Sequence, residues 1–373
     1  MTYETVHELY EDLQQAVKPE DIFGSFNETF DLSVQGSLLE EKYRELLAIV
    51  DVTKYADLYD QAVAEAAKII LDKYYVQAKE WIAIAGYGEA RHVVTSVRSG
   101  QEKFQTERGE YILGEAFVQG DHATLYEGEY VRNNEAVRVA IKITDSAANN
   151  SLITREARTL EAFYEDPADE IKHFPILLDQ FQTDDGRSGL VFRYADNCFD
   201  LYTVRENFRY KNGVHRKHMV WMLNRALSAL TYAHAYERLH GHIEPSHLMI
   251  RPRDHNMFLV GWGHSIFAPK KTGENFSVYN SEFSAPEVKE RGVALRSADI
   301  YSLGMCMVYI LGGNVAAKTI PDDVEDELAN FLGSMILESP FQRAQSALVL
   351  KKQLNAMIVR LWGPKKFLVF EMD

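Results

Sequence analysis

The segment that decides the fold of this chain reads His240-Gly-His-Ile-Glu-Pro-Ser-His-Leu-Met-Ile250. A strong helical pattern over His218–Tyr236 leads into it, with apolar residues recurring at the spacing of one helix face. Two short motifs follow downstream, Phe258-Leu-Val-Gly-Trp-Gly263 and Ser284-Ala-Pro-Glu287. The order of these segments predicts how the rest of the chain folds.

The composition limits the classes of partner. A hydrophobic fraction of 46% is ample for sizeable cores. The net charge of −15 argues against non-specific binding to nucleic acid or to an anionic membrane. The two cysteines, Cys198 and Cys306, lie far apart and fit no disulfide framework. No apolar stretch is long enough to span a bilayer, and the start lacks a secretory pattern. We therefore expect a soluble cytoplasmic protein without nucleic-acid or membrane partners.

The first part of the chain reads as helices. Apolar residues recur at helical spacing over Val6–Val17 and again over Leu58–Ile84. Between them a helix ending near Val50 is predicted, with Ser37 as its N-cap and Glu40 as the capping-box partner.

This helical region resembles a J-domain over about residues 21–84. The resemblance rests on Asp21-Ile-Phe-Gly24, Lys42-Tyr-Arg44 and Lys54-Tyr55. The family's working motif is His-Pro-Asp, which docks on a DnaK-type chaperone, and Asp51-Val-Thr53 stands in its place. The resemblance implies a helical hairpin without co-chaperone activity. A plain helical bundle of other origin fits the same pattern.

From Tyr111 to Lys352 the chain resembles a protein kinase domain. His240–Ile250 resembles that family's catalytic loop, and Val139-Ala-Ile-Lys142 resembles the motif on its third strand. The resemblance implies an α+β, two-lobed fold after an all-α domain. The expected divisions are 1–85 for the helical domain, 86–109 for a connector with a strand over His92–Arg98 that extends the next sheet, 110–196 for the N-lobe and 197–373 for the C-lobe.

Several positions that hold the family's fold are kept. Glu287 ends the Ala-Pro-Glu motif, and Arg343 stands where the family has the arginine that pairs with it. Asp299 matches the carboxylate that braces the backbone of the catalytic loop. We expect Asp299 to accept hydrogen bonds from backbone N–H groups of the His240 segment.

The resemblance also implies nucleotide-contacting positions, namely Gly120, Ala140, Lys142, Glu156 and Met249. Only the middle glycine of the family's glycine loop, Gly120, is present. Lys142 and Glu156 match the family's ion pair, whose lysine holds the ATP phosphates. The pair is explained equally well by nucleotide binding and by structure, because removing one member of a buried pair strands a charge.

The positions that perform phosphoryl transfer in the family are exchanged. His242 replaces the catalytic Asp, Glu244 the loop Lys, His247 the metal-binding Asn and Gly261 the metal-binding Asp. We therefore expect no metal site and no catalytic residues, with nucleotide binding weak and independent of magnesium if it occurs. The hypothesis is a catalytically inactive pseudokinase that acts as a protein-interaction, scaffolding or regulatory module with an unknown protein partner. The alternative is a nucleotide-using transferase with non-standard chemistry in the same cleft.

The histidines support two interpretations. His122, His240, His242, His247 and His264 are all expected near one cleft. Neutral imidazoles bind zinc and related metals, so the cluster is a candidate metal site. Histidines that line a polar groove, with His240 packed against Trp262, explain the same pattern, and we favour this interpretation.

Overall fold

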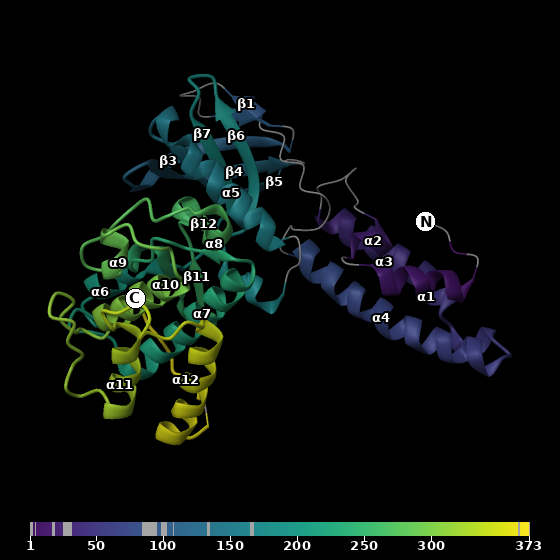
Figure 1. The fold of residues 1–373 in the computed structure, drawn as a ribbon. Helices are drawn as coiled ribbons and strands as arrows, with labels where there is room; N and C mark the ends of the chain where they lie inside the picture. Colours follow the sequence, from purple (N-terminus) through teal and green to yellow (C-terminus); the bar gives the residue numbers. More distant parts are fainter. Residues whose placement is uncertain are drawn as a thin grey trace.

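The computed structural model describes residues 3, 5–16, 19–24, 32–83, 95–97, 103–106, 108–132, 135–164, 168–364 and 366–372 (Figure 1). In this described part, no helix is both long enough and apolar enough to cross a bilayer.

The N-terminal helices form a unit with its own core. The helices are α1 (Val6–Gln15), α2 (Glu20–Phe23), α3 (Leu32–Ile49) and α4 (Leu58–Ala83), with the 3-10 turn η1 (Val52–Lys54) before α4. Thr5 and Glu8 close a capping box at the start of α1. Both α1 and α3 pack on α4, and Leu9, Leu39 and Leu71 are fully buried between them. The expected helical arrangement is present, and Val17 and Ile84 lie outside the described residues.

The predicted start of the second helix is wrong. α3 begins at Leu32, so Ser37 lies inside the helix and is not its N-cap. Gly36 directly precedes Ser37, and glycine is unfavourable inside a helix. A single glycine costs a helix only about 1 kcal/mol, however, and each further residue adds a hydrogen bond. The helix therefore continues through Gly36.

A seven-stranded sheet forms the N-lobe in the order β1-β6-β7-β5-β4-β3-β2. Its strands are β1 (Thr95–Val97), β2 (Lys103–Gln105), β3 (Glu110–Gln119), β4 (Ala123–Arg132), β5 (Glu135–Thr144), β6 (Leu177–Thr183) and β7 (Ser188–Arg193). β1 lies within the predicted strand His92–Arg98 and pairs with β6 in parallel. Alternation along β5 buries Val139, Ile141 and Ile143 against the sheet's core and turns Lys142 to the other face.

The helix α5 (Asn150–Tyr164) joins this sheet to the C-lobe. It contacts β6 and β7 on one side and the turn η6 (Trp262–His264) on the other. Its residues Ile153, Leu160 and Phe163 belong to the same buried cluster as the C-lobe core. Phe163 lies edge-on to Trp262, with ring centroids 5.1 Å apart. The helix that carries Glu156 is therefore fixed relative to both lobes.

Helices make up most of the C-lobe, below the sheet in Figure 1. The longer helices are α7 (Arg216–Ala235), α10 (Arg296–Ile310), α11 (Asp326–Met335) and α12 (Ala347–Trp362), and the shorter ones are α6 (Leu201–Glu206), α8 (Pro269–Thr272) and α9 (Pro286–Lys289). The strands are β8 (Phe199–Asp200), β9 (Arg238–Leu239), β10 (Leu248–Arg251), β11 (Asn256–Leu259) and β12 (Ile266–Phe267), and the 3-10 turns are η4 (Pro245–His247) and η5 (Pro252–Asp254). Two earlier 3-10 turns, η2 (Ala147–Asn149) and η3 (Asp169–His173), precede and follow α5 in the sequence. α10 is buried along almost its whole length, so it forms the centre of this lobe. The observed architecture confirms the expected α+β kinase-like fold.

Candidate active site

Lys142 and Glu156 form a short ion pair at the junction of β5 and α5. Lys142 Nζ lies 2.6 Å from Glu156 Oε2, and the Glu156 side chain is only 3% exposed. The other carboxylate oxygen of Glu156 accepts a hydrogen bond from the backbone N–H of Trp262 at 3.3 Å. The Glu156 carboxylate therefore fixes the position of Lys142 on β5 relative to the Trp262 backbone after β11.

Asp299, on α10, fixes the backbone of the His240 loop through hydrogen bonds. Its carboxylate accepts backbone N–H bonds from His240 and Gly241, both at 2.9 Å. It also lies 2.8 Å from Nε2 of His234, on α7. Burial alone would raise the pKa of Asp299, but the hydrogen bond from His234 and those from the backbone hold that pKa below its usual value. The predicted backbone hydrogen bonds are thus present.

His240 is a buried structural histidine. Its Nε2 lies 2.8 Å from the carbonyl oxygen of Val260, to which it can donate. Its ring packs edge-on against Trp262, with centroids 4.6 Å apart, as the sequence predicted. Burial lowers the pKa of His240 to about 3. A neutral imidazole at this position braces the loop.

His242, at the family's catalytic position, faces a carboxylate. Its Nε2 lies 3.4 Å from Glu244 Oε2. Glu244 also accepts hydrogen bonds from Ser246 Oγ at 2.5 Å and from Asn280 Nδ2 at 2.7 Å. Burial would raise the pKa of Glu244, but the hydrogen bonds from His242 and Ser246 and the nearby His247 lower it. Glu244 is therefore an ionised acceptor that joins the His240 loop to the segment before α9. The sequence predicted Glu244 as an exchanged position but gave no sign of Asn280.

His247 and Gly261 occupy the family's two metal-binding positions. His247 Nδ1 lies 2.7 Å from the carbonyl oxygen of His242. Burial lowers the pKa of His247 to about 4. Gly261 has a left-handed backbone, with φ +81°, and a Cβ added there would lie 2.4 Å from Cδ2 of the His247 ring. The imidazole thus fills the space into which a side chain at position 261 would project.

These positions do not fit magnesium. Mg²⁺ prefers oxygen ligands in octahedral geometry, and here one position offers an imidazole and the other no side chain. Across the described residues, no group of three or more His, Cys, Asp or Glu side chains is placed to hold a metal ion. The candidate metal site formed by the histidines therefore has no support in the geometry.

The five histidines nevertheless form a continuous chain of rings. His242 contacts His247 and His264, with centroids 5.0 and 5.3 Å apart. His264 continues to His122, in the turn between β3 and β4, at 5.9 Å. Nδ1 of His264 lies 3.0 Å from Ser277 Oγ. Burial, with the neighbouring imidazoles, lowers the pKa of His264 to about 3. Imidazoles thus connect the N-lobe turn with the His240 loop.

The other predicted nucleotide-contacting residues lie in the turn after β3 and on the strands β5 and β10. Gly120 donates its N–H to the Ala123 carbonyl at 3.0 Å and so shapes the turn after β3. Ala140, on β5, is paired with Phe192 of β7 and packs against the C-lobe core cluster. Met249, on β10, is paired with Phe258 and is partly exposed.

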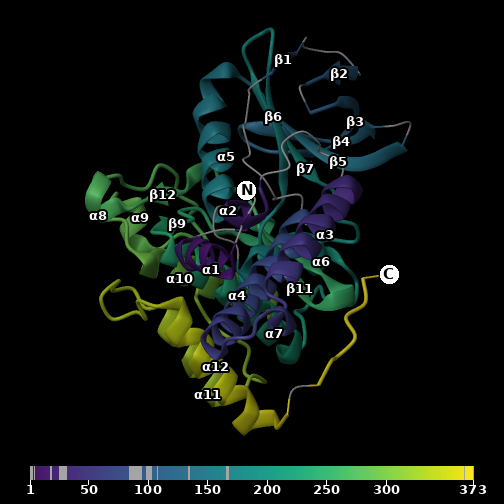
Figure 2. The same cartoon turned by 90° about the vertical axis from the view of Figure 1, so that its right-hand side faces the viewer.

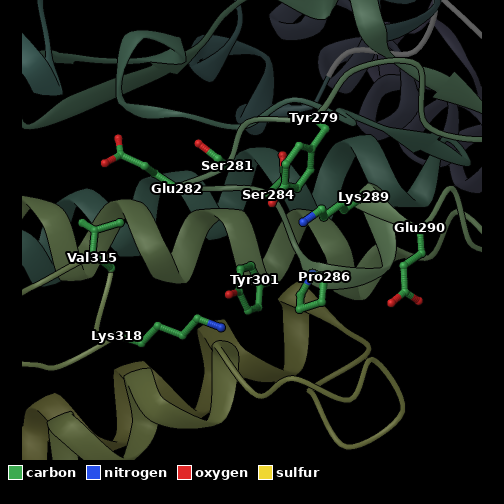
Figure 3. Close-up of a pocket in the computed structure, with 11 residues that line it drawn as sticks. Tyr279, Ser281, Glu282, Ser284, Pro286, Lys289, Glu290, Tyr301, Val315 and Lys318 are labelled. Atoms are coloured by element: carbon green, nitrogen blue, oxygen red, sulfur yellow. The ribbon is translucent and has the colours of Figure 1, made fainter.

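A surface pocket lies beside the segment that precedes α9. A pocket of about 270 Å³ is bordered there by Tyr279, Lys289, Tyr301 and Lys318, among other residues. Figure 3 shows the two lysines approaching it from opposite sides, with Tyr301 on the helix between them. The sequence identified Ser284–Glu287 and the helix that carries Tyr301 in this region. Val315, Ala316 and Lys318 reach the pocket through tertiary contacts, which no sequence motif signalled.

Comparison with known proteins agrees with this architecture. The model of the family described as "Protein kinase domain" matches residues 113–347. The chain is 23% identical over 216 residues to serine/threonine-protein kinase F of Synechocystis, covering 53% of this chain and 43% of that protein. It is 24% identical over 237 residues to serine/threonine-protein kinase PrkC of Bacillus subtilis, covering 62% and 34%. A shorter segment of 89 residues is 34% identical to the dual specificity protein kinase zakA of Dictyostelium, covering 22% and 11%. The chain thus spans less than half the length of these relatives.

These comparisons overturn one sequence-based hypothesis. The catalytically inactive interaction module predicted from the exchanged positions is wrong, because the relatives that match are named as protein kinases. The exchanges at His242, Glu244, His247 and Gly261 alter the site without removing it, because Lys142, Glu156 and the braced loop remain assembled. With its family model matching from the N-lobe sheet to the start of α12, the chain belongs to the protein kinase family.

Proposed function

We propose that this chain is a phosphotransferase of the protein kinase type, which moves the terminal phosphoryl group of a nucleoside triphosphate to a hydroxyl group. The observation that carries this proposal is the Lys142–Glu156 pair, held at 2.6 Å and tied to the Trp262 backbone. Such a pair positions a cation for nucleotide phosphates. The names of the relatives support the same reaction class.

His242 is the proposed general base. An imidazole accepts a proton from an attacking hydroxyl more readily when a carboxylate orients it and stabilises the imidazolium. Glu244 is placed for that role, with its oxygen 3.4 Å from His242 Nε2. The acceptor oxygen forms a bond to the γ-phosphorus as the bond to the β,γ-bridging oxygen breaks. The proton passes to His242, and the nucleoside diphosphate leaves.

The charge on the phosphates is offset by one cation of the chain, Lys142. The rings of His122 and His264 lie beside the glycine-loop turn and add polar groups there without a formal charge from His264. Magnesium has no fitting ligands at positions 247 and 261, so we propose that nucleotide binding is weak and independent of magnesium. Transfer is expected to be slow, because phosphoryl transfer depends largely on positioning and electrostatic stabilisation.

The test measures transfer of labelled γ-phosphate to casein and histones, with magnesium and with a chelator. We expect transfer in both conditions, abolished by Lys142→Met and lowered roughly 10²–10⁴-fold by His242→Gln, the usual effect of losing a positioned base. Lys103→Met and His7→Gln are matched controls, since the side chains are 65% and 42% exposed and both residues lie far along the chain from this site. Transfer that survives both Lys142→Met and His242→Gln, or that is undetectable in the unmodified chain, would refute the proposal.

For the N-terminal helices we propose a J-domain-like hairpin without the chaperone-docking function. Asp51 supports this, because its carboxylate accepts the Thr53 N–H at 3.0 Å and the Thr53 hydroxyl at 2.7 Å. The loop residues are therefore used to cap η1. The full chain should not stimulate the ATPase of a DnaK-type chaperone. Stimulation that Asp51→Ala removes would contradict this.

A further inference from the structure

Residues 366–372, called here the strap, lie on an aromatic surface of the C-lobe. This surface consists of Tyr210, His218, Trp221 and His255. Phe370 stacks on Tyr210 with ring centroids 4.5 Å apart and meets His218 edge-on at 4.8 Å. Phe367 stacks on His255 at 4.0 Å, and His255 stacks in turn on Trp221 at 4.5 Å. Figure 2 shows the strap as the yellow segment that rises from the end of α12 toward the C label.

The end of the strap is also held by polar contacts. Asn207 Nδ2 donates to the Met372 carbonyl at 2.8 Å, and the Tyr210 hydroxyl donates to the Glu371 carbonyl at 2.9 Å. The carboxylate of Glu371 lies 3.7 Å from the Arg209 guanidinium. The surface thus recognises an extended backbone, two aromatic rings three residues apart and an acidic residue after the second ring.

The strap satisfies this surface incompletely. Phe370 is only 4% exposed, but Phe367 and Val369 remain 63% and 65% exposed. Phe370 is the strap ring with the least exposure, and the other contacts are a largely exposed stack and a few polar bonds near the surface. These contacts must offset the conformational entropy of the whole ordered strap, so we infer that the closed state is weakly held. Gly363, with φ +73° at the end of α12, provides a joint from which the strap can swing.

We propose that the aromatic surface is a docking site for an extended segment of a partner protein, with aromatic residues at positions one and four and an acidic residue at position five. The strap occupies this site as an internal competitor. Its tether gives it a high effective concentration, so a partner segment binds well only when its affinity exceeds that of the strap or when the strap is released. This site is separate from the Lys142–Glu156 pair and requires no phosphoryl transfer.

The experiment uses the full chain and a labelled synthetic peptide with the sequence of residues 366–372. Binding is followed by fluorescence anisotropy. We expect weak binding to the unmodified chain and at least tenfold tighter binding to Phe370→Ala, whose own strap no longer competes. Val369→Ala is the matched control, because this strap side chain is exposed and should leave the affinity unchanged. Phe367→Ala provides a second weakened strap if Phe370→Ala does not fold. Phe367 is exposed, so its loss should not unfold the chain, but unlike Val369 it stacks on His255.

Two further arms locate the site and identify the occupant. A peptide carrying Phe370→Ala should not bind, and Trp221→Ala in the Phe367→Ala chain should remove binding of the unaltered peptide. Equal affinity for the unmodified, Phe370→Ala and Phe367→Ala chains would overturn the proposal. Conversion of the chain to a dimer by exchange of straps, seen by light scattering, would also overturn it, since the occupant would then be a second copy of this chain.

Discussion

Gly261 and His247 share one space: a Cβ built on Gly261 would lie 2.4 Å from Cδ2 and 2.6 Å from Nε2 of the His247 ring. A side chain at position 261 therefore requires that the ring at position 247 move or be replaced. In the kinase family these two positions hold metal ions, and in this chain they form one packed imidazole–glycine contact. The two exchanges therefore form a single structural unit.

The first prediction concerns this unit. Gly261→Asp alone should destabilise the protein, by about 1–3 kcal/mol for the left-handed backbone and about 1–3 kcal/mol more for the clash with His247. Gly273→Asp is the matched control, because Gly273 also has a left-handed backbone, with φ +70°, and an added Cβ there would have no neighbour within 4 Å. Urea unfolding should show the larger loss for Gly261→Asp.

The double variant Gly261→Asp, His247→Asn should remove the clash and supply two oxygen ligands. We expect it to gain magnesium-dependent stabilisation by ATP, measured as a thermal shift with and without magnesium. If the unaltered chain already shows a large magnesium-dependent thermal shift, the conclusion that positions 247 and 261 do not fit magnesium is incorrect.

The second prediction concerns Asp299, which is 2% exposed and serves two backbone donors and His234. Asp299→Ala leaves these donors unsatisfied, at about 1–3 kcal/mol each, so the urea midpoint should fall markedly. His242→Ala should change stability little, because His242 makes a longer contact at 3.4 Å. A normal midpoint for Asp299→Ala, with His242→Ala strongly destabilised, would show that the histidines hold the loop instead.

The third prediction concerns the buried pair of Arg343 and Glu287. The guanidinium donates to both carboxylate oxygens, at 2.7 and 2.5 Å, and Arg343 is 2% exposed. Arg343→Met strands Glu287 and should cost about 3–5 kcal/mol in the free energy of unfolding. Lys271→Met, which breaks the exposed pair with Glu237, should cost less than about 1 kcal/mol. Equal losses in the two variants would count against a structural role for the buried pair.

The fourth prediction is a loss of stability in mild acid. Burial lowers the pKa of His173 to about 4 and that of His240 to about 3, below the unfolded value near 6.5. Between these values the unfolded chain binds a proton that the folded chain does not. The stability contributed by each neutral imidazole is therefore complete above about pH 6.5 and falls as the pH drops toward the folded value, by about 1.4 kcal/mol per pH unit for each histidine.

Urea unfolding at several pH values between 7.5 and 4.5 measures this slope. His173→Gln should reduce the slope of the free energy of unfolding against pH by the contribution of about one bound proton. This variant keeps a group that can bond to Asn256, which lies 2.7 Å from His173 Nδ1. A slope that is the same in both proteins would show that His173 does not contribute.

The sequence by itself determined the fold and the supports of the site. The family resemblance carried by Lys142, Glu156, Glu287, Asp299 and Arg343 implied the two lobes. The structure pairs Lys142 with Glu156 and Arg343 with Glu287 and places Asp299 on the His240 backbone, as that resemblance implied. Such pairs can be predicted, because buried charges must have partners and a known order of motifs names them.

Only the tertiary structure decided how the exchanged residues are used. No spacing predicts that Asn280 meets Glu244, that the His247 ring fills the space beside Gly261, or that Phe370 covers Tyr210. Each contact joins segments that are distant in sequence or depends on one side-chain rotamer in a packed interior. The physical reason is that local sequence fixes backbone propensity and hydrophobic pattern, whereas the neighbours of a side chain are set by how whole elements pack.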